Sequence, residues 1–220
     1  QPTEAPTQQA QTTQAAPTEQ PTPEPDLVQQ LMEEMTLEQK VGQLFLVRPD
    51  SLDLSQTQDQ INDAKADGVT ELTDAMRQTL AEYPVGGVVI FGKNLESPQQ
   101  ITQFLDDLQQ ASDTPLFTAI DEEGGLVARL ANNAAFDLPQ YESAAAVGTS
   151  GNPEDARAMG RTIGGYLKEY GFNLDFAPVA DVNTNPDNPV IGTRAFSSEP
   201  QTAADLVGGA CAGFADAGIA

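Results

Sequence analysis

Phe117-Thr-Ala-Ile-Asp-Glu-Glu-Gly-Gly-Leu-Val-Ala-Arg129 is the stretch that decides the fold. It passes from an apolar segment into three consecutive acids, beginning at Asp121, and then through two glycines to an arginine. If residues 115–120 form a buried parallel strand, Asp121 stands at its carboxyl end, where α/β proteins bind their ligands. The two glycines permit a sharp backbone turn, which would bring Arg129 back toward the same opening.

Segments with the patterns of strands and helices alternate along the rest of the chain. Continuous apolar runs predict strands at residues 43–47, 86–91, 115–120 and 173–182, with the start of another at 219–220. Apolar spacing and capping signals predict helices at 27–35, from 36, at 70–83, from 97, at 153–170 and at 198–218. Loops are expected at 121–151 and 183–197.

This alternation is typical of βαβ units and a parallel sheet, and therefore of the α/β class. A closed barrel of eight such units needs roughly 250 residues. The chain has 220 residues, and its pattern contains only about four units. We therefore expect the N-terminal part of a (β/α)8 TIM-like barrel, truncated after about four β/α units. Half of a parallel barrel leaves open strand edges, so we also expect the natural chain to be longer.

The composition limits the classes of partner. The 33 acidic and 10 basic side chains give a net charge of −23, so nucleic acid and anionic membranes would be repelled. There is no histidine, the commonest general base, and the single cysteine, Cys211, excludes a disulfide within the chain. No apolar run reaches the roughly 20 residues of a membrane helix. We expect no cofactor, no metal, and a neutral or cationic ligand.

Residues 1–25 consist of Gln, Thr, Pro, Ala and Glu, without a large aliphatic or aromatic side chain. Such a segment cannot bury enough apolar surface to offset its ordering entropy, so we expect a disordered tether before a folded domain at 26–220. A spacer of this kind, in a chain that starts at Gln1, is typical of secreted or lipid-anchored bacterial surface proteins. We therefore expect an extracellular or cell-surface location, with any lipid anchor outside this sequence. An arbitrary boundary of the segment is the alternative explanation for the missing Met.

Two clusters of polar residues each follow a predicted strand. The first runs from Asp121 to Arg129, and the second, at residues 180–196, contains Asp181, three asparagines and Arg194. Both are expected at the carboxyl-end face of the sheet, so they could converge. Carboxylates accept hydrogen bonds from sugar hydroxyls, and arginine donates in a fixed fork. The pattern therefore suits a polyhydroxylated neutral ligand.

Each of these residues also has a purely structural interpretation. The three acids could form a solvated loop, a glutamate of the first cluster could pair with Arg129, and Arg194 could fasten its own loop to Asp181. Segments rich in asparagine and proline also form turns. Asp175, which alternates with apolar residues, fits a buried structural role as well as a catalytic one.

Five motifs together resemble glycoside hydrolase family 3, most of all its NagZ-type β-N-acetylhexosaminidase branch. They occur in the family's order, and the resemblance covers nearly all of the chain after the tether. It implies a (β/α)8-like barrel and retaining hydrolysis of terminal β-linked N-acetylglucosamine, often from peptidoglycan fragments. The motifs are Met35-Thr-Leu-Glu-Gln-Lys-Val-Gly-Gln43, Gly86-Gly-Val-Val-Ile-Phe91, Asp121-Glu-Glu-Gly-Gly125 with Arg129, Phe176-Ala-Pro-Val-Ala-Asp-Val-Asn183 and Val190-Ile-Gly-Thr-Arg-Ala-Phe196.

The resemblance also assigns residues to roles. Asp121 resembles the family's aspartate that holds sugar hydroxyls, and Arg129 and Arg194 resemble its two substrate-contacting arginines. The family often has glutamine at the position of Glu122 and arginine at that of Leu126, which bears on the sugar preference. Its general acid/base dyad and its aspartate nucleophile have no counterpart in these 220 residues. Because a retaining glycosidase needs both groups, the resemblance implies a fragment that binds substrate but is inactive alone.

Other functions fit the same residues. The nearest alternative is a β-glucosidase or β-xylosidase of the same family. A non-catalytic carbohydrate-binding barrel on the cell surface would keep the fold without the chemistry, and a purely structural acidic surface protein would have no affinity for sugar. The expected partner is a glycan that contains N-acetylglucosamine, and we expect the protein to be a monomer.

Overall fold

The computed structural model describes residues 27–220, so the predicted tether at 1–25 lies outside the described residues. The chain divides into two units: helix α1 (Leu27–Glu34) belongs to the first, and residues 35–220 form the second. Helix α1 confirms the helix predicted for this segment. Within residues 27–220, no helix is both long and apolar enough to cross a membrane.

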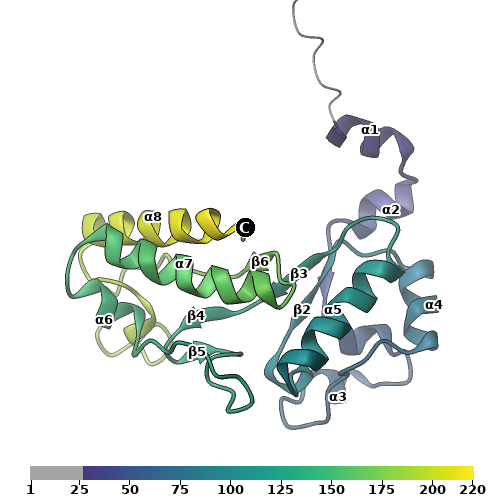
Figure 1. The fold of residues 1–220 in the computed structure, drawn as a ribbon, viewed down its shortest axis with the longest axis horizontal. Helices are drawn as coiled ribbons and strands as arrows, with labels where there is room; N and C mark the ends of the chain where they lie inside the picture. The colour runs from purple at the N-terminus through teal and green to yellow at the C-terminus, as the bar shows by residue number, and fades with distance from the viewer. Residues whose placement is uncertain (1–26) are drawn as a thin grey trace, which may run out of the picture. The chain divides into compact units, whose positions relative to one another are not determined.

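Four short strands form one parallel sheet in the second unit (Figure 1). They lie in the order β1 (Leu46–Val47), β2 (Gly87–Ile90), β3 (Phe117–Ile120) and β6 (Leu174–Asp175), which follows the chain. A helix lies in each connection between these strands. This is the order of a barrel, because a doubly wound sheet reverses direction at a switch point. The α/β class and the partial (β/α)8-like barrel are thus confirmed.

The fourth strand of this sheet is shorter than predicted. The pattern predicts a strand over residues 173–182, but β6 covers only Leu174–Asp175. Pro178 has no N–H group to donate to a strand ladder, so the pairing stops before it. On the free edge of β6, the N–H of Asp175 donates to the carbonyl of Ala220 at 2.9 Å, which brings the chain back to the sheet.

The helices of the second unit begin where the sequence carries capping signals. They are α2 (Leu37–Gly42), α3 (Gln58–Asn62), α4 (Asp74–Glu82), α5 (Pro98–Ala111), α6 (Ala144–Gly148), α7 (Pro153–Glu169) and α8 (Pro200–Ala217). Thr36 accepts a hydrogen bond from the N–H of Gln39, and Ser97 accepts one from that of Gln100. These contacts close the first turns of α2 and α5. Helix α4 begins later than predicted, after the N-cap Thr73.

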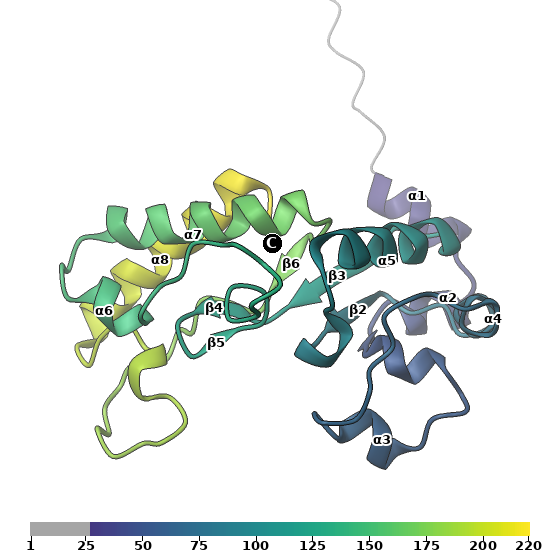
Figure 2. The same ribbon diagram turned by 60° about the horizontal axis from the view of Figure 1, so that its bottom comes forward.

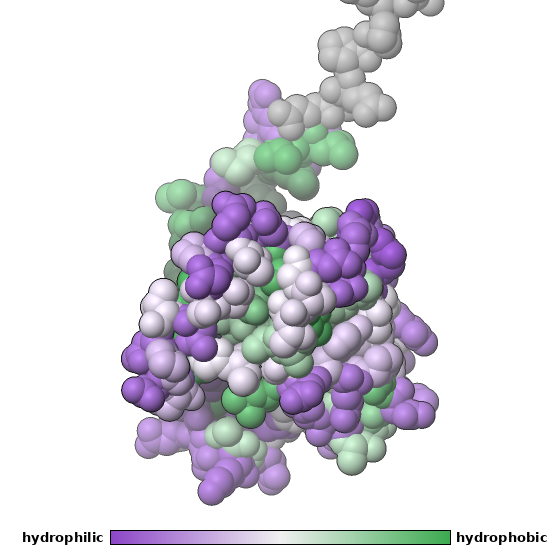
Figure 3. Space-filling model, turned by 90° about the vertical axis from the view of Figure 1, so that its left-hand side faces the viewer, coloured by the Kyte–Doolittle hydropathy of each residue, from purple (hydrophilic) through white to green (hydrophobic). Residues whose placement is uncertain are grey.

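Helix α5 and the pair of α7 and α8 supply much of the helical part of the core. Helices α7 and α8 run side by side in both ribbon views (Figure 2). They approach closely at Gly160, where a Cβ atom would lie 2.3 Å from the carbonyl oxygen of Ala210. On the α6–α8 side of the unit, hydrophilic residues surround small separate hydrophobic areas (Figure 3). Helix α5 buries the predicted stripe of Ile101, Phe104, Leu105 and Leu108.

The segment 121–151 is not the plain loop that the sequence predicted. It contains α6 and an antiparallel hairpin of β4 (Glu122–Gly124) and β5 (Val127–Ala128). Gly124 and Gly125, with φ of 82° and 72°, adopt the left-handed region that the turn requires. Strands of two or three residues are too short to show an alternating pattern, so the sequence indicated only the turn.

Candidate functional site

Asp121 and Arg129 form the first ion pair of the candidate site. Asp121 directly follows β3, and the β4–β5 hairpin turns the chain so that Arg129 returns beside it. The Nη2 atom of Arg129 donates to Oδ2 of Asp121 at 3.0 Å, and both side chains are partly exposed. The turn is tightly packed, because a Cβ atom on Gly125 would lie 2.8 Å from the carbonyl oxygen of Glu142. The expected return of Arg129 to the strand end is confirmed.

Arg194 and Glu123 form the second ion pair. Arg194 lies in a short 3-10 helix, η3 (Gly192–Arg194), and its Nε and Nη2 atoms donate to the two carboxylate oxygens of Glu123 at 2.7 and 2.6 Å. The hydrogen bonds to Glu123 raise the pKa of Arg194 above its usual value. Glu123 is 7% exposed and Arg194 22%, so solvent screens this pair less than a surface pair.

The two clusters predicted from the sequence therefore meet at one face. Glu123 lies two residues after Asp121, and Arg194 reaches it from a segment 71 residues further along the chain. Two structural alternatives are wrong: Arg129 pairs with Asp121 rather than with a glutamate, and Arg194 pairs with Glu123 rather than with Asp181. The asparagine-rich loop forms turns, since Asn188 accepts hydrogen bonds from its own segment.

Glu122, the middle acid, anchors the hairpin from inside. It is fully buried, and its carboxylate accepts hydrogen bonds from the N–H groups of Leu130 and Ala131 at 2.8 and 2.9 Å. The hydroxyl of Tyr166, on α7, donates to the same carboxylate at 2.9 Å. Desolvation raises the pKa of Glu122, while these hydrogen bonds act in the opposite direction. Burial also raises the pKa of Tyr166, so it stays a hydrogen-bond donor.

Asp175 is a second buried carboxyl group at the same strand ends. It is 5% exposed, and its Oδ1 atom accepts a hydrogen bond from the N–H of Glu122 at 2.9 Å. Its Oδ2 atom is buried without a hydrogen-bond partner in residues 27–220. Burial, together with the charges of the neighbouring acids Glu122, Asp121 and Glu123, raises the pKa of Asp175 to about 8. A neutral carboxyl group therefore links β6 to the start of the hairpin.

Two neighbours of the ion pairs were not singled out by sequence reasoning. Arg48 follows β1 and Phe91 follows β2, so both occupy the strand-end positions that Asp121 occupies after β3. The Arg48 guanidinium lies 4.4 Å from the centroid of the Phe91 ring, and that of Arg129 lies 6.0 Å from it. Their position directly after apolar runs is the signal that could have identified them.

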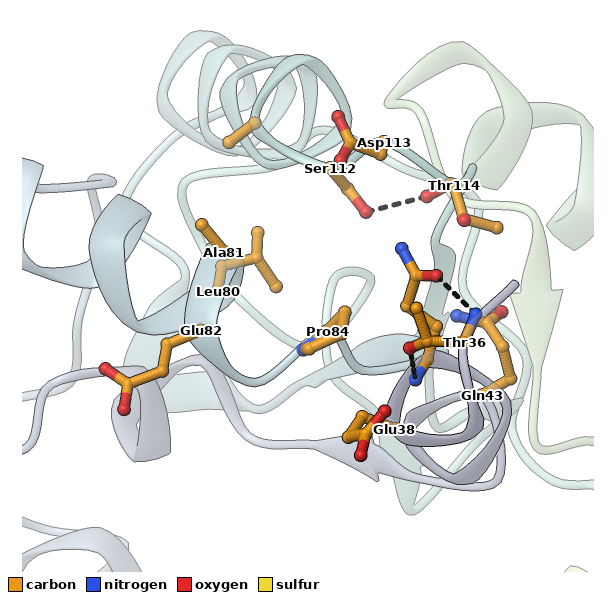
Figure 4. A pocket seen from close by; sticks show the side chains of 12 residues that line it. Thr36, Glu38, Gln43, Leu80, Ala81, Glu82, Pro84, Ser112, Asp113 and Thr114 are labelled. Atoms are coloured by element: carbon orange, nitrogen blue, oxygen red, sulfur yellow. Dashed lines mark hydrogen bonds between the residues drawn. The ribbon is translucent and has the colours of Figure 1, made fainter. Parts of the chain in front are cut away.

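A separate cavity of about 390 Å³ opens at the opposite, amino end of the strands (Figure 4). It is lined by residues that precede β1, β2 and β3, among them Gln43, Pro84 and Thr114. None of the predicted site residues lies there. In the described part of the chain, no three His, Cys, Asp or Glu side chains are grouped so that they could hold a metal ion.

A parallel sheet in barrel order, with two acid–arginine pairs at its carboxyl end, defines a domain of the (β/α)8 class with a candidate polar site at that end. The chain belongs to glycoside hydrolase family 3, because residues 36–220 match the model described as the glycosyl hydrolase family 3 N terminal domain. The resemblance seen in the sequence motifs is thereby confirmed.

The chain is also similar to several beta-hexosaminidases and to a solved family 3 structure. Beta-hexosaminidase A of Pseudoalteromonas piscicida is 36% identical over 143 residues, which are 63% of this chain and 24% of that protein. The beta-hexosaminidase of Thiobacillus denitrificans is 34% identical over 155 residues, or 69% of this chain and 42% of that protein. A family 3 beta-N-acetylglucosaminidase structure from Paenibacillus sp. strain FPU-7 matches with a TM-score of 0.70 and 35% identity, over 84% of this chain and 32% of that one. This chain thus spans less than half the length of each of these three proteins.

Proposed function

We propose that this chain forms the sugar-binding portion of a retaining β-N-acetylhexosaminidase, a hydrolase that releases terminal β-linked N-acetylglucosamine. The observation that carries the proposal is the meeting of two acid–arginine pairs at the carboxyl end of a family 3 sheet. The names of the relatives support the same substrate class. Peptidoglycan fragments or related glycans are the substrates that we expect, and the role that we propose is in carbohydrate metabolism.

The geometry suits a neutral sugar. The Asp121 carboxylate has accepting capacity beyond its bond to Arg129, so it can accept hydrogen bonds from sugar hydroxyls. The guanidinium of Arg194 is fixed by Glu123 and by the carbonyl of Val190, so it meets a ligand with little loss of side-chain freedom. A hydrogen bond to a charged group contributes about 1.5–3 kcal/mol.

The acids of this face are placed for binding rather than for bond cleavage. A retaining glycosidase uses two carboxyl groups about 5–5.5 Å apart, one on each side of the sugar. Asp121 and Glu123 are each paired with an arginine, and Glu122 and Asp175 are buried beneath the hairpin. In the proposed enzyme, the general acid/base and the nucleophile therefore come from residues other than these 220.

The test compares the 220-residue chain with the whole protein on p-nitrophenyl N-acetyl-β-glucosaminide. We expect the whole protein to hydrolyse this substrate faster than the matching β-glucoside or β-xyloside, and the 220-residue chain to bind N-acetylglucosamine without hydrolysing it. Hydrolysis by the 220-residue chain would show that it holds a catalytic pair. A preference for the glucoside or xyloside would move the assignment to those family 3 enzymes, and binding without hydrolysis by the whole protein would indicate a non-catalytic surface protein.

The proposal extends to location and assembly. The Gln/Thr/Pro-rich segment at residues 1–25 supports an extracellular or cell-surface protein, secreted or held by a lipid anchor. We expect activity in the medium or on intact cells and a monomer in analytical ultracentrifugation. Activity confined to the cell interior would contradict the location.

A further inference from the structure

A second cavity lies beside the Asp121–Arg129 pair, at the carboxyl ends of β1 and β2. It encloses about 360 Å³, and its lining includes Arg48, Phe91, Lys93 and Arg129 together with residues near α3. Arg129 thus contacts both the sugar-binding face and this cavity. Three cationic side chains around one cavity are unexpected in a chain with 33 acids and 10 bases.

Lys93 is not available to a ligand. Its Nζ atom donates to the carbonyls of Gln60 and Ile61 at 3.0 and 3.1 Å, and it lies 3.3 Å from the buried carboxylate of Asp50. Its three N–H donors therefore all have partners, and its charge is compensated. Arg129 is likewise compensated by Asp121, although its Nε atom is buried without a hydrogen-bond partner in residues 27–220.

Arg48 is different, because no ion pair compensates its charge within the described residues. Its Nη1 atom donates to the carbonyl of Ile61 at 2.7 Å and lies 3.4 Å from Oδ1 of Asn62, and its plane contacts the Phe91 ring. Asp63, the residue after Asn62, does not pair with Arg48, because its carboxylate accepts a hydrogen bond from the N–H of Lys65. In residues 27–220, the Nε and Nη2 atoms of Arg48 have no hydrogen-bond partner. These two atoms form the edge of a guanidinium that binds a carboxylate through two parallel hydrogen bonds.

We propose that this cavity binds a carboxylate on the sugar unit next to the one held by Asp121 and Arg129, with Arg48 as its partner. This inference rests on the proposed function, because it takes the sugar-binding face as its neighbour. One uncompensated positive charge matches the single charge of a carboxylate better than the double charge of a phosphate. The Asp121 carboxylate repels an anion from its own side of Arg129, so neutral hydroxyls bind there and the acid binds beside Arg48.

The arginine is held ready before any ligand arrives. The carbonyl of Ile61 fixes one nitrogen, and the ring of Phe91 supports the plane of the guanidinium. Such preorganisation lowers the ordering cost of binding. The site therefore favours glycans in which terminal N-acetylglucosamine is followed by an acidic sugar.

The test uses two disaccharides that differ in one feature. N-acetylglucosaminyl-β-1,4-glucuronic acid carries a carboxylate, whereas N,N′-diacetylchitobiose is neutral, and both have a terminal β-linked N-acetylglucosamine. By calorimetry on the 220-residue chain at low salt, we expect the acidic disaccharide to bind at least tenfold more tightly. We expect Arg48→Gln to remove this preference, Arg48→Lys to keep only part of it, and Arg77→Gln, which alters a surface pair with Asp107, to leave it unchanged.

The controls separate this proposal from the proposed function. Arg48→Lys keeps the charge if Arg48→Gln unfolds, and thermal unfolding of each variant shows which one is folded. Equal affinity for the two disaccharides, or a preference that survives Arg48→Gln, overturns the carboxylate site even though sugar binding stands. Displacement of the acidic disaccharide by inorganic phosphate at lower concentration than by acetate overturns the carboxylate assignment. If neither disaccharide binds but acetate binding still depends on Arg48, the anion site stands and the proposed function fails.

Discussion

The two ends of the parallel sheet use their polar side chains differently. At the amino end, Thr36 caps the first turn of α2, and Ser112 donates to the carbonyl of Thr114, so these groups complete local backbone structure. At the carboxyl end, Oδ2 of Asp175 and Nε of Arg129 are buried without a hydrogen-bond partner among residues 27–220. Buried polar atoms are normally satisfied, so this difference supports the proposal that the carboxyl end of the sheet binds a ligand.

The largest expected effect comes from removing the paired charges of the carboxyl end. In the whole protein, Asp121→Ala and Arg194→Ala should each lower kcat/KM for p-nitrophenyl N-acetyl-β-glucosaminide by about 2 kcal/mol or more, roughly 30-fold, because each removes a charge-assisted contact. Arg161→Ala, which removes a surface arginine paired with Asp216, is the matched control and should have little effect. Unchanged kcat/KM in both site variants would remove these residues from the site.

A smaller effect is expected on the free energy of unfolding, through Asp175 at the carboxyl end of the sheet. The pKa of Asp175 is raised to about 8 in the folded protein, so between about pH 4 and pH 8 the folded state binds more protons than the unfolded state. The stability contributed by this group is therefore present at low pH and is lost as pH rises through this window. Asp175→Asn, which keeps an acceptor for the N–H of Glu122, should raise the free energy of unfolding at pH 8 by on the order of 1–3 kcal/mol.

Urea denaturation at pH 4, 6 and 8 measures this difference between Asp175→Asn and the wild type. The gain in stability should shrink toward pH 4, where the carboxyl group of Asp175 is neutral in the folded state and about half protonated in the unfolded state. Asp181→Asn, which changes an exposed acid, is the control and should show no such trend. A gain that is independent of pH would mean that Asp175 is ionised in the folded protein.

At the amino end we expect an effect on stability alone. Thr36→Ala removes the N-cap of α2 and should lower the free energy of unfolding by about 1 kcal/mol. Sugar affinity should stay as in the wild type, because this cap lies at the opposite end of the strands from Asp121 and Arg194. Denaturation and calorimetry on the same preparation test both statements, and a parallel loss of affinity would break the division between the two ends.

The smallest effect is expected at Asp187, an exposed acid of the second cluster. Asp187→Ala should change the free energy of unfolding by less than about 0.5 kcal/mol, as is usual for exposed positions. It should leave sugar binding unchanged, since this part of the loop forms turns rather than contacts with the ion pairs. A marked loss of binding would extend the site further into the loop than the ion pairs indicate.

The sequence predicted the framework of this domain well. Apolar runs placed β2 and β3, capping signals placed α2 and α5, and strand-end position placed Asp121 at the carboxyl end of the sheet. The sequence could not say which acid pairs with which arginine. That choice depends on the β4–β5 hairpin, whose strands are too short for a periodic pattern. Arg48 was missed for a related reason, because its lack of an acidic partner is a property of the packed structure.

The hairpin has a consequence for how this domain tolerates change. The turn bears one exposed residue, Leu126, which is 73% exposed, so its identity matters little for the packing of the hairpin. The number of residues between Asp121 and Arg129 is not free, because inserting one would exchange the inward and outward faces of a strand. An insertion in the turn would break the register that pairs Arg129 with Asp121 and that lets Glu122 accept from the N–H groups of Leu130 and Ala131. Loop length, more than loop composition, is therefore the property that related chains have to share at this position.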